Sequence, residues 1–265
     1  MIKRNDILSP REELKNFSIF LDQNPWFSSI SVPHDLKKIL SNNGKIGDVC
    51  KYSLVKFPFK NINLDRHVRP NWVSRLAREN EGESRVLLEV ACECNYNFDE
   101  DNISDPIIML ATKIIIQFDY FLDSNIEDPK TLQCSWHLDK HDPNKGASTS
   151  HPLYHYEYGG TEIRKTEGFN YGDFILMDSP RIMHPPLDLV LAFDFVIKNF
   201  YTYETHKVLT DDLLYKRYIK NAQYRLWRPY AISFASHFHD FNDIYTIDRA
   251  FADNILHCTN KAEIY

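Results

Sequence analysis

The sequence predicts an α+β fold, with a central antiparallel sheet of about five to six strands flanked by N-terminal helices and a C-terminal helical region. Apolar residues repeat at helical spacing near the start, alternate with period two through the middle, and return to helical spacing after Pro185 and Pro186. Short connections between the middle segments favour an antiparallel meander. The order helices, sheet, helices is typical of the α+β class.

Residues 1–80 are expected to form a basic, mostly helical N-terminal segment. Ser9 and Pro10, followed by two glutamates, provide a capping oxygen, a proline in the first turn and acids near the positive end of a helix. The segment PHDLKKILSN (33–42) predicts a second short helix, and residues 49–59 suit a strand.

Residues 81–200 are expected to contain the antiparallel sheet and a buried helix. The expected strands alternate in polarity or are rich in β-branched and aromatic residues. They are 85–96, 113–122, 131–141, 154–158 and 172–177. The apolar run LDLVLAFDFVIKNF then predicts a largely buried helix.

Residues 201–265 are expected to form C-terminal helices that pack on the same core, so that the chain makes one domain overall. Helical spacing recurs at 211–227, 230–237 and 247–258. Pro229 is expected to break the helix between the first two of these segments, because proline cannot donate a backbone hydrogen bond.

Composition narrows the class of protein. Hydrophobic residues make up 43% and aromatic residues 14% of the 265 residues, enough for a substantial core. With 8 glycines and no GxGxxG or GxxxxGK[ST] motif, the common nucleotide-binding folds are not expected. Five cysteines without a secretory leader, and no apolar run of about 18 residues, predict a soluble, cytoplasmic protein with reduced thiols and no membrane partner.

Charge is distributed unevenly along the chain. Residues 1–80 carry a net charge of +6, residues 81–200 carry −12, and residues 201–265 are balanced. The acidic middle would repel a bare phosphate and attract a divalent cation or a basic partner.

Histidines and acids gather within this acidic middle. They are His137, Asp139, His141, Asp142, His151, His155 and Glu157. Imidazoles and carboxylates at this density suit both metal binding and acid–base chemistry, because histidine titrates near neutral pH.

A strand at 131–141 would place His137, Asp139 and His141 on one face, about 6.6 Å apart. A hairpin returning through 153–158 would bring His155 and Glu157 beside that face. A slip of one residue would bring the tyrosines of this segment there instead. A polar strand end that simply faces solvent is the competing interpretation.

Structural roles are also possible for the other candidate residues. Arg181, in MDSPRIMHPP, is a candidate phosphate clamp through its bidentate guanidinium, or pairs with a nearby acid. Cys92, Cys94 and Cys134 lie on the expected core faces, which indicates buried structural thiols in preference to a zinc site.

The run from IIIQFDYF through QCSWHLDKHDP and TSHPLYHYEYGG to an apolar helix resembles the TumE-type toxins of bacterial toxin–antitoxin systems, over residues 113–200. In that family two strands lead to a His-rich turn with Asp or Asn, a Pro-His cluster and a helix. Tyr154 stands where the family tends to have another histidine, and the flanking helical regions are additional. The resemblance implies a bacterial stress or defence context and action on RNA, and identifies no catalytic residues.

Three interpretations of the function remain open. The first is a phosphodiesterase or nuclease that acts on RNA or DNA, with or without a divalent metal (zinc or manganese). In it His137, His141 and His155 would be ligands or acid–base groups, Asp139 a ligand or orienting carboxylate, and Arg181 the phosphate clamp.

The alternative is a non-catalytic adaptor or structural subunit of a bacterial defence complex, binding a protein partner or a second copy. The 15 Tyr, 17 Phe and 4 Trp favour it, because aromatic side chains anchor interfaces. A third interpretation is a structural metal site at the turn of the sheet, whose loss would unfold the protein.

Overall fold

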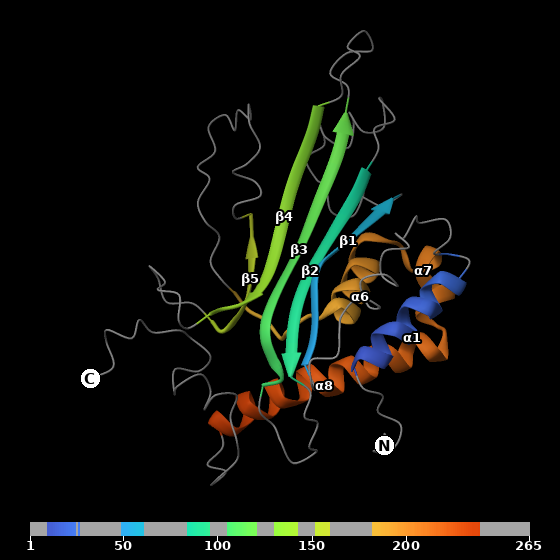
Figure 1. Ribbon diagram of the computed structural model, residues 1–265. Coiled ribbons are helices and arrows are strands. Elements are labelled where there is room, and N and C mark those ends of the chain that lie inside the picture. The colour runs from blue at the N-terminus through green and yellow to red at the C-terminus, as the bar shows by residue number, and fades with distance from the viewer. Residues whose placement is uncertain are drawn as a thin grey trace, which may run out of the picture.

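The α+β class is confirmed by a computed structural model, which describes residues 10–24, 26, 49–60, 84–95, 105–120, 130–142, 152–159 and 182–238. Six strands form one antiparallel sheet in the order β1-β2-β3-β4-β5-β6. Helices from both ends of the described chain lie along one side of this sheet (Figure 1).

The strands are β1 Val49–Lys60, β2 Ser84–Asn95, β3 Ile107–Tyr120, β4 Lys130–Lys140, β5 Tyr154–Tyr158 and β6 Ile182–Met183. Four of the predicted strands agree closely with β1, β2, β4 and β5. The third begins six residues earlier than predicted, where the Asp105 carboxylate accepts a hydrogen bond from the Ile107 amide (3.0 Å). The expected strand at 172–177 lies outside the described residues, and the two-residue β6 was not predicted.

The helices are α1 Pro10–Gln23, α6 Leu189–Phe200, α7 Tyr203–Thr210 and α8 Leu213–Phe238. The first helix and the buried helix were predicted, whereas α7 was not. The predicted break at Pro229 is wrong, because α8 continues through it. Leu226, Tyr230 and Ser233 remain buried on either side of the proline, so packing keeps this face helical. The helices expected at 33–42 and 247–258 fall outside the described residues.

One hydrophobic core lies between the helices and the sheet. Its members come from α1, β1 to β5 and the three later helices. Val86, Leu88 and Val90 on β2 are fully buried, and α6 packs against this strand. Cys92 and Cys94 are buried in the same core, as expected, while Cys134 is partly buried against it.

Charged residues tie the helical layer together. Arg225 on α8 forms ion pairs with Glu13 on α1 and with Asp188, whose Oδ2 lies 3.1 Å from Nη2 of the guanidinium. The other oxygen of Asp188 accepts a hydrogen bond from the Leu191 amide (3.0 Å) and caps α6. All three charged side chains are almost completely buried. Among the described helices, none has the length and apolar character needed to cross a membrane.

Candidate functional site

The histidine–carboxylate cluster lies where β4 pairs with β5. Alternation along β4 puts Leu138 into the core and turns His137 and Asp139 to the opposite face of the sheet. The antiparallel register sets His137 opposite Glu157 and Asp139 opposite His155. The predicted hairpin register is therefore confirmed, and the slipped alternative, with tyrosines on this face, is not adopted.

Four side chains come within interaction distance. His137 Nε2 lies 3.3 Å from Glu157 Oε2 and 3.7 Å from Asp139 Oδ2. The rings of His137 and His155 are 6.1 Å apart and almost perpendicular, at 83°. One potential ligand atom from each of His137, Asp139 and His155 lies within 4.8 Å of the other two.

The cluster is open to solvent on one side only. His155 and Glu157 are buried, whereas the side chains of His137 and Asp139 are 20% and 33% exposed. His137 and Asp139 are therefore the members of the cluster that are in contact with solvent.

His155 is held in one tautomer. Its Nδ1 lies 3.3 Å from the carbonyl oxygen of Pro152, and a carbonyl oxygen can only accept a hydrogen bond. Nδ1 is therefore the protonated nitrogen of the neutral ring, and Nε2 keeps its lone pair for a metal or a proton.

The Asp139 carboxylate is largely removed from water, and the groups around it only partly replace the lost hydration. Burial raises the pKa of its carboxyl group, and the charges of His137 and Lys113 and the backbone of Thr112 offset this in part, while Glu157 adds to the rise. Within the described part of the chain, Oδ1 of Asp139 is buried without a hydrogen-bond partner. A buried acceptor in this state favours binding of a proton or a cation.

A row of charged and titratable side chains crosses the sheet beside the cluster. Glu89 on β2 is opposite Lys113 on β3, Lys113 is opposite His137, and His137 is opposite Glu157. Glu89 and Lys113 are a directly opposite pair of unlike charge, which stabilises adjacent antiparallel strands. Lys113 is also a cation beside the cluster, and its charge acts on Asp139.

One further predicted site residue, His141, is described by the structure, and it is not a member of this group. His141 lies just beyond the end of β4, where its amide donates to the Leu153 carbonyl (2.7 Å), and it is not among the three residues whose ligand atoms meet. The exposed Asp142 follows it. His151 and Arg181 lie outside the described residues, so the phosphate clamp stays a prediction.

Glu157 was expected to lie beside the His137 face, because it shares a strand face with His155, but it was given no role in the site. The structure places it directly opposite His137, with its Oε2 3.3 Å from Nε2 of the imidazole. His184 lies on the other side of β5, with its ring 5.8 Å from that of Tyr156 and its Nδ1 donating to the Pro185 carbonyl (2.6 Å). Burial lowers the pKa of His184.

No family model, curated protein or solved structure matches the chain. The cluster itself limits the chemistry. Two imidazoles and two carboxylates can bind a divalent cation, or can move protons to and from a substrate.

Proposed function

We propose that this protein is an enzyme of the phosphodiesterase or nuclease type, whose active centre contains His137, Asp139, His155 and Glu157. The observation that supports it is the convergence of these groups from two strands, with ligand atoms of His137, Asp139 and His155 within 4.8 Å of one another. The partial exposure of His137 and Asp139 gives a substrate access to them.

Phosphodiester cleavage needs one group to take a proton from the nucleophile and another to protonate the leaving oxygen. Without a metal, His137 would be the group that exchanges a proton, since it is partly exposed and lies between two carboxylates that orient its ring; with a metal bound, it would be a ligand instead. His155 is the second imidazole. A divalent cation would offset the repulsion between phosphate and the acidic middle of the chain.

RNA is the preferred substrate in this proposal, within a bacterial stress or defence system. The resemblance of residues 113–200 to TumE-type toxins favours it. Lys113 is the described cation that can help hold a phosphate near Asp139.

The test is incubation of end-labelled RNA and DNA with the full chain under a series of divalent ions. His137→Gln and His155→Gln are expected to lower cleavage by about 100-fold or more, the size of a general acid–base contribution. His184→Gln is the matched control, because it removes an imidazole from the other side of the same strands. Nucleic acid left intact by the wild type under every ion would refute the proposal.

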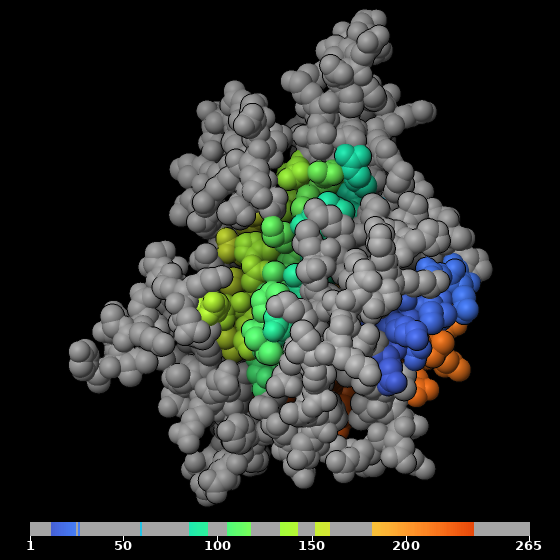
Figure 2. All heavy atoms as spheres, viewed as in Figure 1, coloured from blue at the N-terminus to red at the C-terminus, as the bar shows by residue number. Residues whose placement is uncertain are grey.

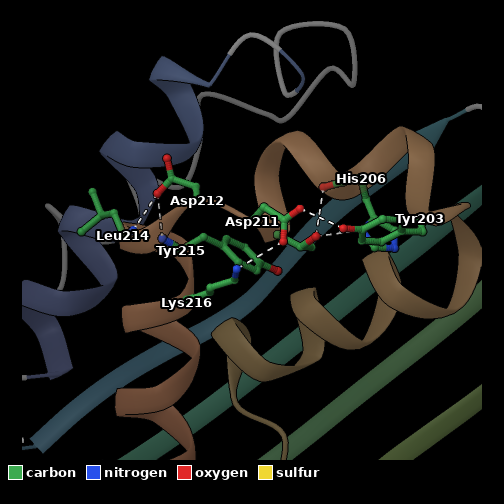
Figure 3. A network of polar contacts seen from close by, with 8 residues as sticks. Tyr203, His206, Asp211, Asp212, Leu214, Tyr215 and Lys216 are labelled. Carbon is green, nitrogen blue, oxygen red and sulfur yellow. Dashed lines mark hydrogen bonds and ion pairs between the residues drawn. The ribbon is translucent and has the colours of Figure 1, made fainter.

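A second candidate function, a non-catalytic subunit, is favoured by apolar side chains exposed where α7 meets α8. Leu213 is 83% exposed, and Tyr203, Val208 and Leu214 are also exposed. Figure 3 shows the polar contacts that hold this corner: Asp212 Oδ1 accepts the Leu214 amide (2.7 Å), so the first turn of α8 is capped with its leucines outward.

Light scattering and affinity capture of the wild type and Leu213→Asp test this alternative. A protein that degrades no nucleic acid, but loses self-association or a defined partner in Leu213→Asp, would be a subunit and not a nuclease. An unchanged mass and partner list in the variant would count against it.

A further inference from the structure

We infer that His137, Asp139 and His155 form a binding site for a first-row transition-metal dication, in a two-histidine, one-carboxylate set like those of mononuclear iron(II) and zinc(II) centres. This deepens the proposed function, because it names the cofactor class of the same cluster. The role of the metal in catalysis rests on the proposed function, whereas the binding of the metal does not.

The spacing suits a single ion. Ligand atoms about 2.1 Å from a metal lie about 3.0–3.4 Å from one another in octahedral or tetrahedral geometry. The three candidate atoms lie within 4.8 Å of one another, and two of them belong to side chains on the solvent-accessible side of the cluster. Binding of one ion would require these side chains to rotate and to bring the three atoms closer together.

Backbone positions hold these ligands in register. His137 and Asp139 are separated by one residue on β4, and His155 is the direct cross-strand partner of Asp139 on β5. A site on paired strands is better fixed than one on a loop. Three positions on two adjacent strands therefore provide the ligands that the described residues offer.

The hydrogen bond of His155 prepares it as a ligand. Because Nδ1 donates to the Pro152 carbonyl, Nε2 presents its lone pair. Metal-binding histidines commonly donate their second ring nitrogen to a carbonyl or carboxylate in this way.

The two carboxylates attract a cation. Asp139 Oδ1 is buried without a hydrogen-bond partner among the described residues, which an ion would provide. Glu157, with Oε2 3.3 Å from His137 Nε2, adds a second negative charge at the edge of the site.

The donor set selects among metals. Magnesium and calcium prefer oxygen ligands, whereas two imidazoles favour iron, zinc and neighbouring metals. Structural zinc sites usually have four protein ligands, while three leave room for water or substrate. The site therefore fits a reactive centre better than a structural one.

Isothermal titration of the chelator-treated full chain with Zn²⁺, Mn²⁺, anaerobic Fe²⁺ and Mg²⁺ tests the inference, together with the visible spectrum of the Co²⁺ form. One equivalent of transition metal should bind, and a large excess of Mg²⁺ should not displace it. Circular dichroism should be the same with and without metal. Equal binding of Mg²⁺, or no binding of any transition metal, would overturn the inference. A chain that unfolds without metal would refute the assignment as a reactive centre.

Variants locate the site. Asp139→Asn and His155→Gln should abolish binding, Glu157→Gln should weaken it about 10- to 100-fold, and His184→Gln should leave it unchanged. Binding that is lost in His184→Gln but kept in His155→Gln would overturn the assignment of the ligands. Metal bound at this site with nucleic acid left intact would refute only the phosphodiesterase; cleavage without metal binding would refute only this inference.

Discussion

His184 makes stability depend on pH. Burial holds its folded-state pKa below the ordinary value of 6.5, so the unfolded chain binds the proton first. The stabilisation is complete above about pH 6.5 and is lost as the pH falls through the folded-state pKa. The urea midpoint should therefore decrease from pH 7 to pH 5, and less steeply in His184→Gln.

His206 is a second histidine that contributes to the pH dependence of stability. Its pKa is also lowered, mainly by burial, so the slope should shrink in His184→Gln without disappearing. A midpoint with the same pH dependence in wild type and variant would show that His184 does not titrate differently on folding.

Tyr154 has a buried hydroxyl group whose loss should be costly. The hydroxyl donates to the Asp105 carboxylate, 2.8 and 2.7 Å from its two oxygens, and Lys140 Nζ lies 2.8 Å from the same carboxylate. Tyr154→Phe should lower the free energy of unfolding by about 1.5–3 kcal/mol, the range for hydrogen bonds to charged groups. Urea denaturation measures it.

Tyr203→Phe is the matched control, since the Tyr203 hydroxyl also donates to a carboxylate, that of Asp211 (2.9 Å), but on an exposed surface (Figure 3). Water replaces that bond, so a much smaller change is expected. Equal losses in the two variants would mean that burial does not strengthen the Tyr154 contact.

At the level of elements, Arg225 connects three helical segments. Its ion pairs join α8 to α1 through Glu13 and to the N-terminus of α6 through Asp188. Arg225→Met would leave both carboxylates buried without their cation, which should cost about 3–5 kcal/mol in the free energy of unfolding. Arg217→Met, at an exposed position of the same helix, should leave the urea midpoint nearly unchanged.

A double variant that neutralises both Glu13 and Arg225 separates the effect of charge from the effect of packing on the free energy of unfolding. Adding Glu13→Gln to Arg225→Met removes one of the uncompensated charges, so the double variant should regain part of the loss. If the two losses simply add, the cost of Arg225→Met comes from packing alone.

Long strands were predictable from the sequence because their alternation is strict. The alternation around Trp136 fixed which face of β4 would hold His137, and the same period applied to β5. Local sequence did not fix where β4 pairing would stop, and His141 falls just past that point. The cross-strand register distinguishes Glu157, which is opposite His137, from His141, which lies beyond the end of the β4–β5 ladder.

The helical errors have a different origin. Pro229 removes one backbone donor, but the burial of Leu226 and Tyr230 on one face outweighs that local cost. The short α7 has only three buried residues in eight, so its apolar pattern was too weak to predict. Tertiary packing determines both the continuity of α8 and the formation of α7, and the spacing of apolar residues along the sequence does not predict that packing.

At the scale of the whole molecule, the two faces of the sheet have different roles. One face of β4 and β5 contributes Leu138 and Tyr154 to the core under the helices. The other face presents the histidine–carboxylate cluster. Period-two alternation lets the same two strands serve stability and chemistry, so substitutions at 137, 139 and 155 should affect the site more than the core.

A single core predicts a single unfolding transition. Residues of α1, the sheet, α6, α7 and α8 belong to one contiguous hydrophobic cluster, so no helix can leave without exposing apolar surface of the others. Trp136 on β4 packs against Phe200 at the end of α6, and Trp227 on α8 donates to the Pro186 carbonyl (2.8 Å), so tryptophan fluorescence reports on both layers. Urea curves from fluorescence and from far-ultraviolet circular dichroism should coincide, in the wild type and in Trp136→Phe. Separate midpoints would show that the sheet and the helical layer unfold as independent units.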